Sequence, residues 1–268
     1  MTIVAIIGDA TTTTTVALAA GWPATDEAIV FEADPTGGSL AGWLDTPAQP
    51  SLATIVANVG SDARRDHRST MATVNSMIHH SSSGLRFVAN AVRSRAAHRA
   101  VGEAAASVVP ALAATDAVVI ADAGAHRADL AVPPTLIAAD VVVLVHRQAA
   151  ASAAAATVHI ERLVETVEVL AQLDADLVLA VIGNTPFDPG EIGAFVADSV
   201  PGSIRSIASL SDDPLAAATI AGRAGVSAKR LQRLPLMRDA STLGRVVSEL
   251  VDERRSFGAR VGAVRQAP

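Results

Sequence analysis

Short apolar runs alternate with longer stretches of mixed polarity along most of this chain. The runs are rich in β-branched residues and have no polar face, which is typical of strands buried on both faces of a parallel sheet. The stretches between them have the length or the periodicity of crossover helices. This alternation predicts a doubly wound α/β fold, with a mostly parallel sheet and helices on both faces. The predicted strands are Thr2–Ile7, Ala28–Glu32, Leu85–Ala89, Ala117–Asp122, Val141–Val145 and Leu177–Ile182, and the predicted helices are Thr14–Ala20, Ser51–Val59, Arg95–Ala113, Ala150–Leu173, Pro189–Asp198 and Leu243–Val251.

Composition narrows the possible classes of protein. Half of the 268 residues are hydrophobic but only 3% are aromatic, which suits helices packed on a sheet better than an aromatic-rich sandwich. The chain has no cysteine, so it can form neither disulfides nor cysteine-ligated metal sites, as is common in cytoplasmic proteins. Charged residues interrupt every apolar run before it reaches the roughly 18 residues that a bilayer span needs. We expect one domain over residues 1–253 and a loosely ordered tail over residues 254–268.

Hydroxyl, carboxylate and amide side chains follow four of the predicted strands. The carboxyl ends of parallel strands meet at one edge of the sheet, where ligands of this fold class bind. Such groups beside glycine-rich turns could hold a phosphate and Mg²⁺. They also have structural interpretations, because threonines cap helices, Asp and Asn form turns, and a carboxylate can brace a neighbouring strand. The candidates are Gly8, Thr11, Thr12, Thr13 and Thr14 after the first strand, Asp34 after the second, Asp122 after the fourth and Asn184 after the sixth.

Over residues 1–250 these motifs resemble, in their order, the MinD/ParA branch of P-loop ATPases. The run from Glu32 to Gly37 is similar to the family's D-x-D-P-x-G switch, with Glu for the first Asp. The resemblance implies that Asp122 is the Walker B aspartate, that Asn184 contacts the base, and that Thr13 and Asp122 hold Mg²⁺. Asp34 would orient water in an active enzyme. The flavour of Trp22-Pro23, of Ala33 to Gly38 and of Asp212-Asp213-Pro214 is similar to MinD-like proteins of actinobacterial Tad-type pilus and secretion gene clusters, relatives of CpaE and TadZ.

The first loop departs from the family's K-G-G-x-G-K-T-T motif. Ile7 stands at the signature lysine, Asp9 at the second glycine, Thr11 at the third and Thr12 at the P-loop lysine; Gly8 and the hydroxyl of Thr13 remain. Residues 1–60 contain six acids and no Lys, Arg or His, so this part of the chain supplies no cation to a triphosphate. A carboxylate at the loop would add repulsion of roughly 1–4 kcal/mol. We therefore expect weak ATP binding and no fast hydrolysis.

The function predicted is that of a degenerate, non-hydrolysing MinD/ParA-like protein, with no cofactor or with weakly bound ATP or ADP and Mg²⁺. It would act as a cytoplasmic localisation or regulatory partner of a Tad-like pilus or secretion apparatus, recruited to the inner face of the membrane by a protein such as its ATPase, and it could form a homodimer. One alternative is a weak Mg²⁺-dependent ATPase with a threonine-rich loop. Another is a nucleic-acid-binding module that uses the basic residues 205–268, although these include acids and few aromatic residues.

Two other segments carry expectations of their own. The polar stretch 60–84 includes Arg, His and Ser clusters, and we interpret it as a solvated helix and loop. The last predicted helix has an aliphatic stripe that comprises Leu243, Val246, Val247 and Leu250, and its opposite face mixes acids with arginines. A membrane-surface anchor usually adds bulky aromatic residues and a strongly basic face. We therefore expect this helix to face the core and to provide no direct membrane anchor.

Overall fold

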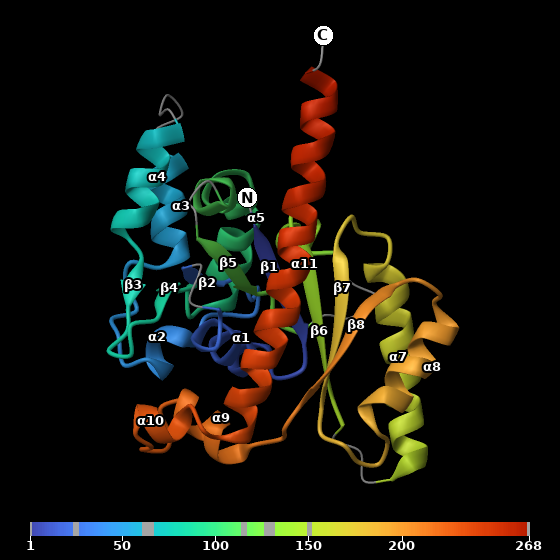
Figure 1. Ribbon diagram of the computed structural model, residues 1–268. Helices are drawn as coiled ribbons and strands as arrows, with labels where there is room; N and C mark the ends of the chain where they lie inside the picture. The colour runs from blue at the N-terminus through green and yellow to red at the C-terminus, as the bar shows by residue number, and fades with distance from the viewer. Residues whose placement is uncertain are drawn as a thin grey trace.

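A computed structural model describes residues 2–23, 27–60, 67–113, 117–125, 132–148 and 152–266. Eight strands form a single sheet in the order β3-β4-β2-β5-β1-β6-β7-β8 (Figure 1). All neighbouring strands are parallel except β3 and β4, which pair antiparallel at one edge. The strands are β1 (Ile3–Gly8), β2 (Ala28–Glu32), β3 (His79–His80), β4 (Arg86–Val88), β5 (Val118–Asp122), β6 (Val141–Arg147), β7 (Asp176–Ile182) and β8 (Ile204–Leu210).

Helices cover both faces of this sheet, as Figure 1 shows. On β1, Ile3, Ala5 and Ile7 enter one hydrophobic core, and Val4 and Ile6 enter the other, because side chains alternate along a strand. One core is closed by α3 (Leu52–Gly60), α4 (His67–Ser76), α5 (Ser94–Ala113), α6 (Pro134–Ile137), α7 (Ala153–Leu170) and α8 (Pro189–Ser199). The other is closed by α1 (Thr11–Ala20), α2 (Leu40–Trp43), α9 (Pro214–Ile220), α10 (Ala228–Leu231) and α11 (Pro235–Gln266).

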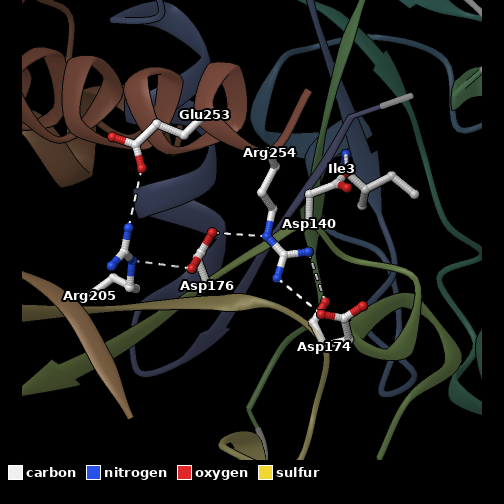
Figure 2. Close-up of polar contacts among 7 residues, drawn as sticks. All are labelled: Ile3, Asp140, Asp174, Asp176, Arg205, Glu253 and Arg254. Atoms are coloured by element: carbon white, nitrogen blue, oxygen red, sulfur yellow. Dashed lines mark hydrogen bonds and ion pairs between the residues drawn. The ribbon is translucent and has the colours of Figure 1, made fainter. Parts of the chain in front are cut away.

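The last helix, α11, is anchored to the sheet by its aliphatic stripe and by ion pairs. Leu243, Val247 and Leu250 are buried against the strands, which confirms the prediction that this helix faces the core. At the amino-terminal edge of the strands, Arg254 Nε donates to Asp176 Oδ2 over 2.9 Å, and its Nη1 donates to the carbonyl of Asp174 over 3.0 Å (Figure 2). These contacts extend the anchorage beyond the apolar stripe.

Arg205 of β8 completes this network. It lies 3.3 Å from Asp176 and 3.2 Å from Glu253 of α11, so two guanidinium groups share the carboxylate of Asp176 (Figure 2). On β1, the amide of Ile3 donates to Asp140 Oδ2 over 2.8 Å. The helix then runs to Gln266, where the sequence predicted a loosely ordered tail after residue 253. The anchoring of Arg254, and of Arg255 on Thr2 Oγ1 at 2.8 Å, explains why helical structure continues past Val251.

The remaining sequence predictions agree with the structure except at a few elements. The predicted parallel strands all form, and α1 begins at Thr11, three residues before the predicted start. The sequence missed β8, which is half-exposed along its length, and the two-residue β3. It also missed four short helices, α2, α6, α9 and α10. In the polar stretch, α4 occupies 67–76, while residues 61–66 lie outside the described part of the chain, as do residues 150 and 151 before α7.

Candidate functional site

The loop between β1 and α1 is held against the ends of two neighbouring strands by its own backbone. The amide of Gly8 donates to the carbonyl of Gly124 over 3.2 Å, and that of Asp9 donates to the carbonyl of Val145 over 2.9 Å. Gly8 has a φ of +111°, and a Cβ there would meet the Val145 oxygen at 2.2 Å, so only glycine fits this turn. Ala10 adopts the left-handed conformation before α1, and no side chain caps the helix.

Thr12 and Asp122 form the centre of the site. Thr12 Oγ1 donates to Asp122 Oδ2 over 2.6 Å, and the amide of Gly124 donates to Asp122 Oδ1 over 3.2 Å. The side chain of Thr11 also bonds to this carboxylate. Asp122 is completely buried, and this burial raises the pKa of its carboxyl, although the hydrogen bonds from Thr12, Thr11 and Gly124 oppose the shift. Thr12 is therefore a hydroxyl donor to the buried carboxylate at the end of β5.

A second buried carboxylate, Glu32, lies beside Asp122, because the two residues are in register on β2 and β5. Its side chain accepts three backbone hydrogen bonds: Oε1 from Ser39 at 2.5 Å and from Leu40 at 2.9 Å, and Oε2 from Asn90 at 2.8 Å. Burial raises the pKa of Glu32, and these bonds lower it by a smaller amount. Glu32 thus joins the loop after β2 to the loop after β4.

The loop after β2 and the loop after β5 contact each other. Asp34 accepts hydrogen bonds from the amide of Thr36 at 2.8 Å and from its hydroxyl at 2.7 Å, and its own carbonyl accepts one from Asn90 Nδ2 at 2.9 Å. Gly124, with a φ of +72°, packs so closely on Asp34 that a Cβ would lie 2.5 Å from the carboxyl carbon. In the described part of the chain, the side chain of Asp34 therefore stabilises a turn through its hydrogen bonds to Thr36.

Thr13 and Thr14 line a cavity of about 290 Å³ between the loop, the ends of β6 and β7, and α9. Arg147 and Arg223 line the same cavity. The guanidinium of Arg147 pairs with both oxygens of Asp212 at 2.9 and 3.0 Å, and its amide donates to Asp9 Oδ2 over 2.9 Å.

Two polar atoms of this cavity's lining are buried without a hydrogen-bond partner: Thr14 Oγ1 and Asp213 Oδ2. Buried polar atoms are usually paired, so both atoms are candidates for ligand contact. Asn184 is exposed in the loop after β7 and is not among the residues that line the cavity. The structure thus places Thr11 and Thr12 on Asp122, places Thr13 and Thr14 at the cavity, and leaves Asn184 apart from both groups.

The sequence analysis did not include Arg147 or Arg223 among the candidate site residues. Arg147 ends β6, and its position directly after a buried apolar run was the available signal. Arg223 follows α9, where the chain turns at Gly222 with a φ of +68°, and no local motif marks it. The positive charge at this site therefore comes from the second half of the chain, whereas the first 60 residues supply none.

The residues present do not fit a Mg²⁺–triphosphate in the way that the resemblance implies. The hydroxyl that donates to Asp122 Oδ2 is that of Thr12, and Thr13 lines the cavity instead. Ile7, at the signature lysine, is completely buried in the core. Within the described residues, no group of three or more acidic or histidine side chains is arranged to hold a metal ion.

Several solved structures have a fold similar to that of this chain. The chain aligns with a ParA family ATPase from Chlorobium tepidum at 13% identity, covering 91% of this chain and 97% of that one, with a TM-score of 0.64. It aligns with MinD in the MinC:MinD complex of Aquifex aeolicus at 10% identity, with 93% and 96% coverage and a TM-score of 0.61. Apo McdA from Cyanothece gives 14% identity, 91% and 99% coverage and a TM-score of 0.59. The chain has the MinD/ParA fold.

This similarity confirms the predicted fold class, and at these identities it concerns the fold alone. A scan against protein-family models found no match, and a search of curated proteins found none either. In the part of the chain that the structure describes, no helix has both the length and the hydrophobicity to cross a bilayer.

Proposed function

We propose that this MinD/ParA-fold protein acts without hydrolysing ATP, as a localisation or regulatory partner of other proteins. The observation that carries the proposal is the hydrogen bond between Thr12 Oγ1 and Asp122 Oδ2 at 2.6 Å. In a working phosphate loop, the residue at this position is a lysine that neutralises the phosphate oxygens, and the Walker B aspartate serves Mg²⁺. Here the two positions bond to each other.

The charges around the loop support the same proposal. Asp9 places a carboxylate at the loop, and the hydrogen bond from the amide of Arg147 holds it there. Without the lysine, a triphosphate loses a charge-assisted contact worth about 1.5–3 kcal/mol. This loss and the repulsion from Asp9 remove a large share of the roughly 8 kcal/mol that micromolar binding requires.

Calorimetric titration with ATP–Mg²⁺ and ADP–Mg²⁺ tests this proposal. We expect a dissociation constant in the millimolar range or no binding. In a thermal melt, about 1 mM ATP–Mg²⁺ would then add only about 0.4 kcal/mol to the stability of the fold. A micromolar constant would refute the proposal.

The resemblance to MinD-like proteins of Tad-type clusters gives the class of partner: a component of a pilus or secretion apparatus, such as its ATPase or a membrane protein. The solved MinC:MinD complex provides a precedent for a protein of this fold that assembles with another protein. Affinity capture with purified components of such an apparatus tests this partnership. Capture of equal strength with and without ATP is the expected result, and capture only with ATP would contradict the nucleotide-independent role.

A second candidate function is a weak ATPase, and the cavity lined by Thr13 and Thr14 favours it. Arg147 and Arg223 could supply the positive charge that the loop lacks, and Thr14 Oγ1 and Asp213 Oδ2 are available for ligand contact. In this alternative, phosphate release from ATP would be measurable, and Arg223→Gln would reduce it. Arg99→Gln, which changes an exposed guanidinium on α5, is the matched control.

A further inference from the structure

A second cavity, of about 440 Å³, lies at the opposite end of α1 from the loop between β1 and α1. Its walls come from the last turns of α1, the start of β2, the β3–β4 turn, α10 and the first turn of α11. The volume falls within the range of small-molecule sites, which is roughly 300–1,000 Å³. None of the residues of the loop between β1 and α1 contributes to it.

The cavity exists because small side chains face large ones. Ala19 and Ala28 leave space between α1 and β2 that their neighbours do not fill. Leu231 of α10 and Met237 of α11 line the opposite side and pack on the same core. The lining is mixed: these residues form an apolar part, and Glu27, Ser83, Arg86 and Gln232 form a polar part. An apolar molecular body would be stabilised against the first part by the removal of its surface from water.

Two hydrogen-bond donors of this lining have no partner among the described residues. Trp22 is only 9% exposed, and its Nε1–H is buried and unpaired. Arg86 Nε is likewise buried and unpaired, while its Nη1 is engaged by Glu27 Oε2. Leaving a buried donor unpaired costs about 1–3 kcal/mol, so a ligand that brings an acceptor oxygen gains the corresponding free energy.

The charge balance of the cavity selects among acceptors. The positive charge of Arg86 is already compensated by Glu27, which is also part of the lining. A carboxylate would therefore add an unbalanced negative charge beside Glu27, whereas a neutral carbonyl oxygen accepts from the same donors without that repulsion. Tryptophan Nε1 is a donor only, and the guanidinium has no acceptor, so only an acceptor of the ligand can satisfy these two groups.

We propose that this cavity binds a small uncharged molecule that carries a carbonyl group on an apolar body, and that Trp22 Nε1–H and Arg86 Nε–H donate to its oxygen. Trp22 and Arg86 would thus bind the polar end of the molecule, and alanine, leucine and methionine side chains of the lining would contact its apolar body. The site is separate from the loop between β1 and α1. Its occupancy is therefore independent of whether the chain binds ATP.

The two tryptophans of the chain give a direct test, because each indole N–H has its own signal in a proton–nitrogen NMR spectrum. Trp22 reports on the cavity, and Trp43, which is half-buried in α2, is the internal control. We expect acetophenone to shift the Trp22 indole signal saturably and to leave that of Trp43 in place. Benzoate, of the same size but charged, and toluene, which lacks an acceptor, should both bind more weakly.

Variants separate the donors from the shape of the cavity. Trp22→Phe removes one N–H and keeps the aromatic ring, and Arg86→Lys removes Nε–H and keeps a cation for Glu27. Each should weaken acetophenone binding roughly three- to tenfold, as measured by calorimetry. Ala19→Leu should abolish binding by occupying the cavity, and Trp43→Phe should leave it unchanged.

An unmoved Trp22 signal with both acetophenone and 2-octanone would overturn the proposal, and so would equal shifts of both tryptophans. Toluene binding as tightly as acetophenone would show that the donors have no part in recognition, and tighter binding of benzoate would show that the class of ligand is wrong. The Trp43 signal and the melting curve of each variant establish whether it is folded, so a loss of binding is not mistaken for a loss of structure.

Discussion

A variant with a lysine at position 12 tests whether the absence of a positive charge in the loop between β1 and α1 is what weakens ATP binding. In Asp9→Gly/Thr12→Lys, the carboxylate at the loop is removed and an ammonium group is placed where Thr12 now bonds to Asp122. The buried carboxylate of Asp122 keeps a partner, because the lysine donates to it in place of the hydroxyl. The hydrogen bond between Asp9 and the amide of Arg147 is lost, which leaves that amide facing the cavity.

The expected gain in nucleotide affinity follows from these contacts. A lysine contact with a phosphate contributes about 1.5–3 kcal/mol. The side chain of Asp9 is 57% exposed, so water screens its repulsion and its removal adds only about 1 kcal/mol. The sum is about 2.5–4 kcal/mol, which tightens binding roughly a hundred- to a thousandfold. A millimolar dissociation constant for ATP–Mg²⁺ would therefore become micromolar.

Calorimetric titration of the double variant beside Asp9→Gly/Thr12→Met measures this gain, since methionine has similar length and no charge. Tight binding by the lysine variant alone is the expected result. If both variants bind as weakly as the natural chain, the deficit of charge is not what limits binding. The conformation of the loop, with Thr11 at the third glycine, would then be the cause.

Four further outcomes are expected. Asp122→Asn should raise stability in urea denaturation more at neutral pH than near pH 3.8, the ordinary pKa of an Asp carboxyl. Burial raises the pKa of the Asp122 carboxyl, so the folded natural chain holds this proton more tightly than the unfolded chain does, and it loses stability as the pH rises from 3.8 through the pKa of the folded state. Asn carries no charge at either pH; its oxygen accepts from the amide of Gly124, and its nitrogen donates to Thr12 Oγ1. Arg254→Leu should lower the free energy of unfolding by roughly 1–3 kcal/mol, since it leaves Asp176 and Asp174 without this partner. Arg99→Leu, on the exposed face of α5, should leave the free energy of unfolding nearly unchanged. Equal effects of the two substitutions would show that the network of Arg254 contributes nothing specific. Gly8→Ala should destabilise the fold by at least about 2 kcal/mol, because its Cβ would meet the Val145 oxygen, while Gly102→Ala, which meets no atom within 4 Å, should be neutral or stabilising in the same thermal melt. Sedimentation should give the same oligomeric state with and without ATP, because the buried Ile7 cannot reach a partner's phosphates as the signature lysine would; dimers that form only with ATP would contradict this.

The strands could be predicted because burial on both faces leaves runs without a polar residue. Such runs make up most of β1, β5, β6 and β7, and the polar residues of these strands lie at their ends. The edge strand β8 is different. Its residues alternate between half-buried and exposed, with Arg205 and serines among them, because only one of its sides pairs with a neighbour. An apolar run is therefore absent, and the strand forms by pairing with β7, which is a tertiary effect.

The candidate site was predictable in its residue types but not in its pairings. A run of five threonines at the start of a helix contains a hydroxyl for Asp122 in any register, since successive side chains turn by about 100° around the axis. Which threonine meets the carboxylate depends on where α1 begins, and it begins at Thr11. This places Thr12 on Asp122 and Thr13 at the cavity. The arginines of that cavity come from β6 and from the chain after α9, a juxtaposition that only the tertiary fold creates.

Hydrogen bonds within the chain join the loops at the carboxyl ends of the strands to one another. Thr12 connects the first loop to β5, Asn90 Nδ2 connects the end of β4 to Asp34, and Glu32 connects the segments that contain Ser39 and Asn90. A ligand can shift a conformational equilibrium only by the difference between its free energies of binding to the two states. Where internal hydrogen bonds already order the loops, a nucleotide has few contacts left that would distinguish an ordered from a disordered state. This favours a protein that presents one fixed surface to a partner over one that switches with ATP.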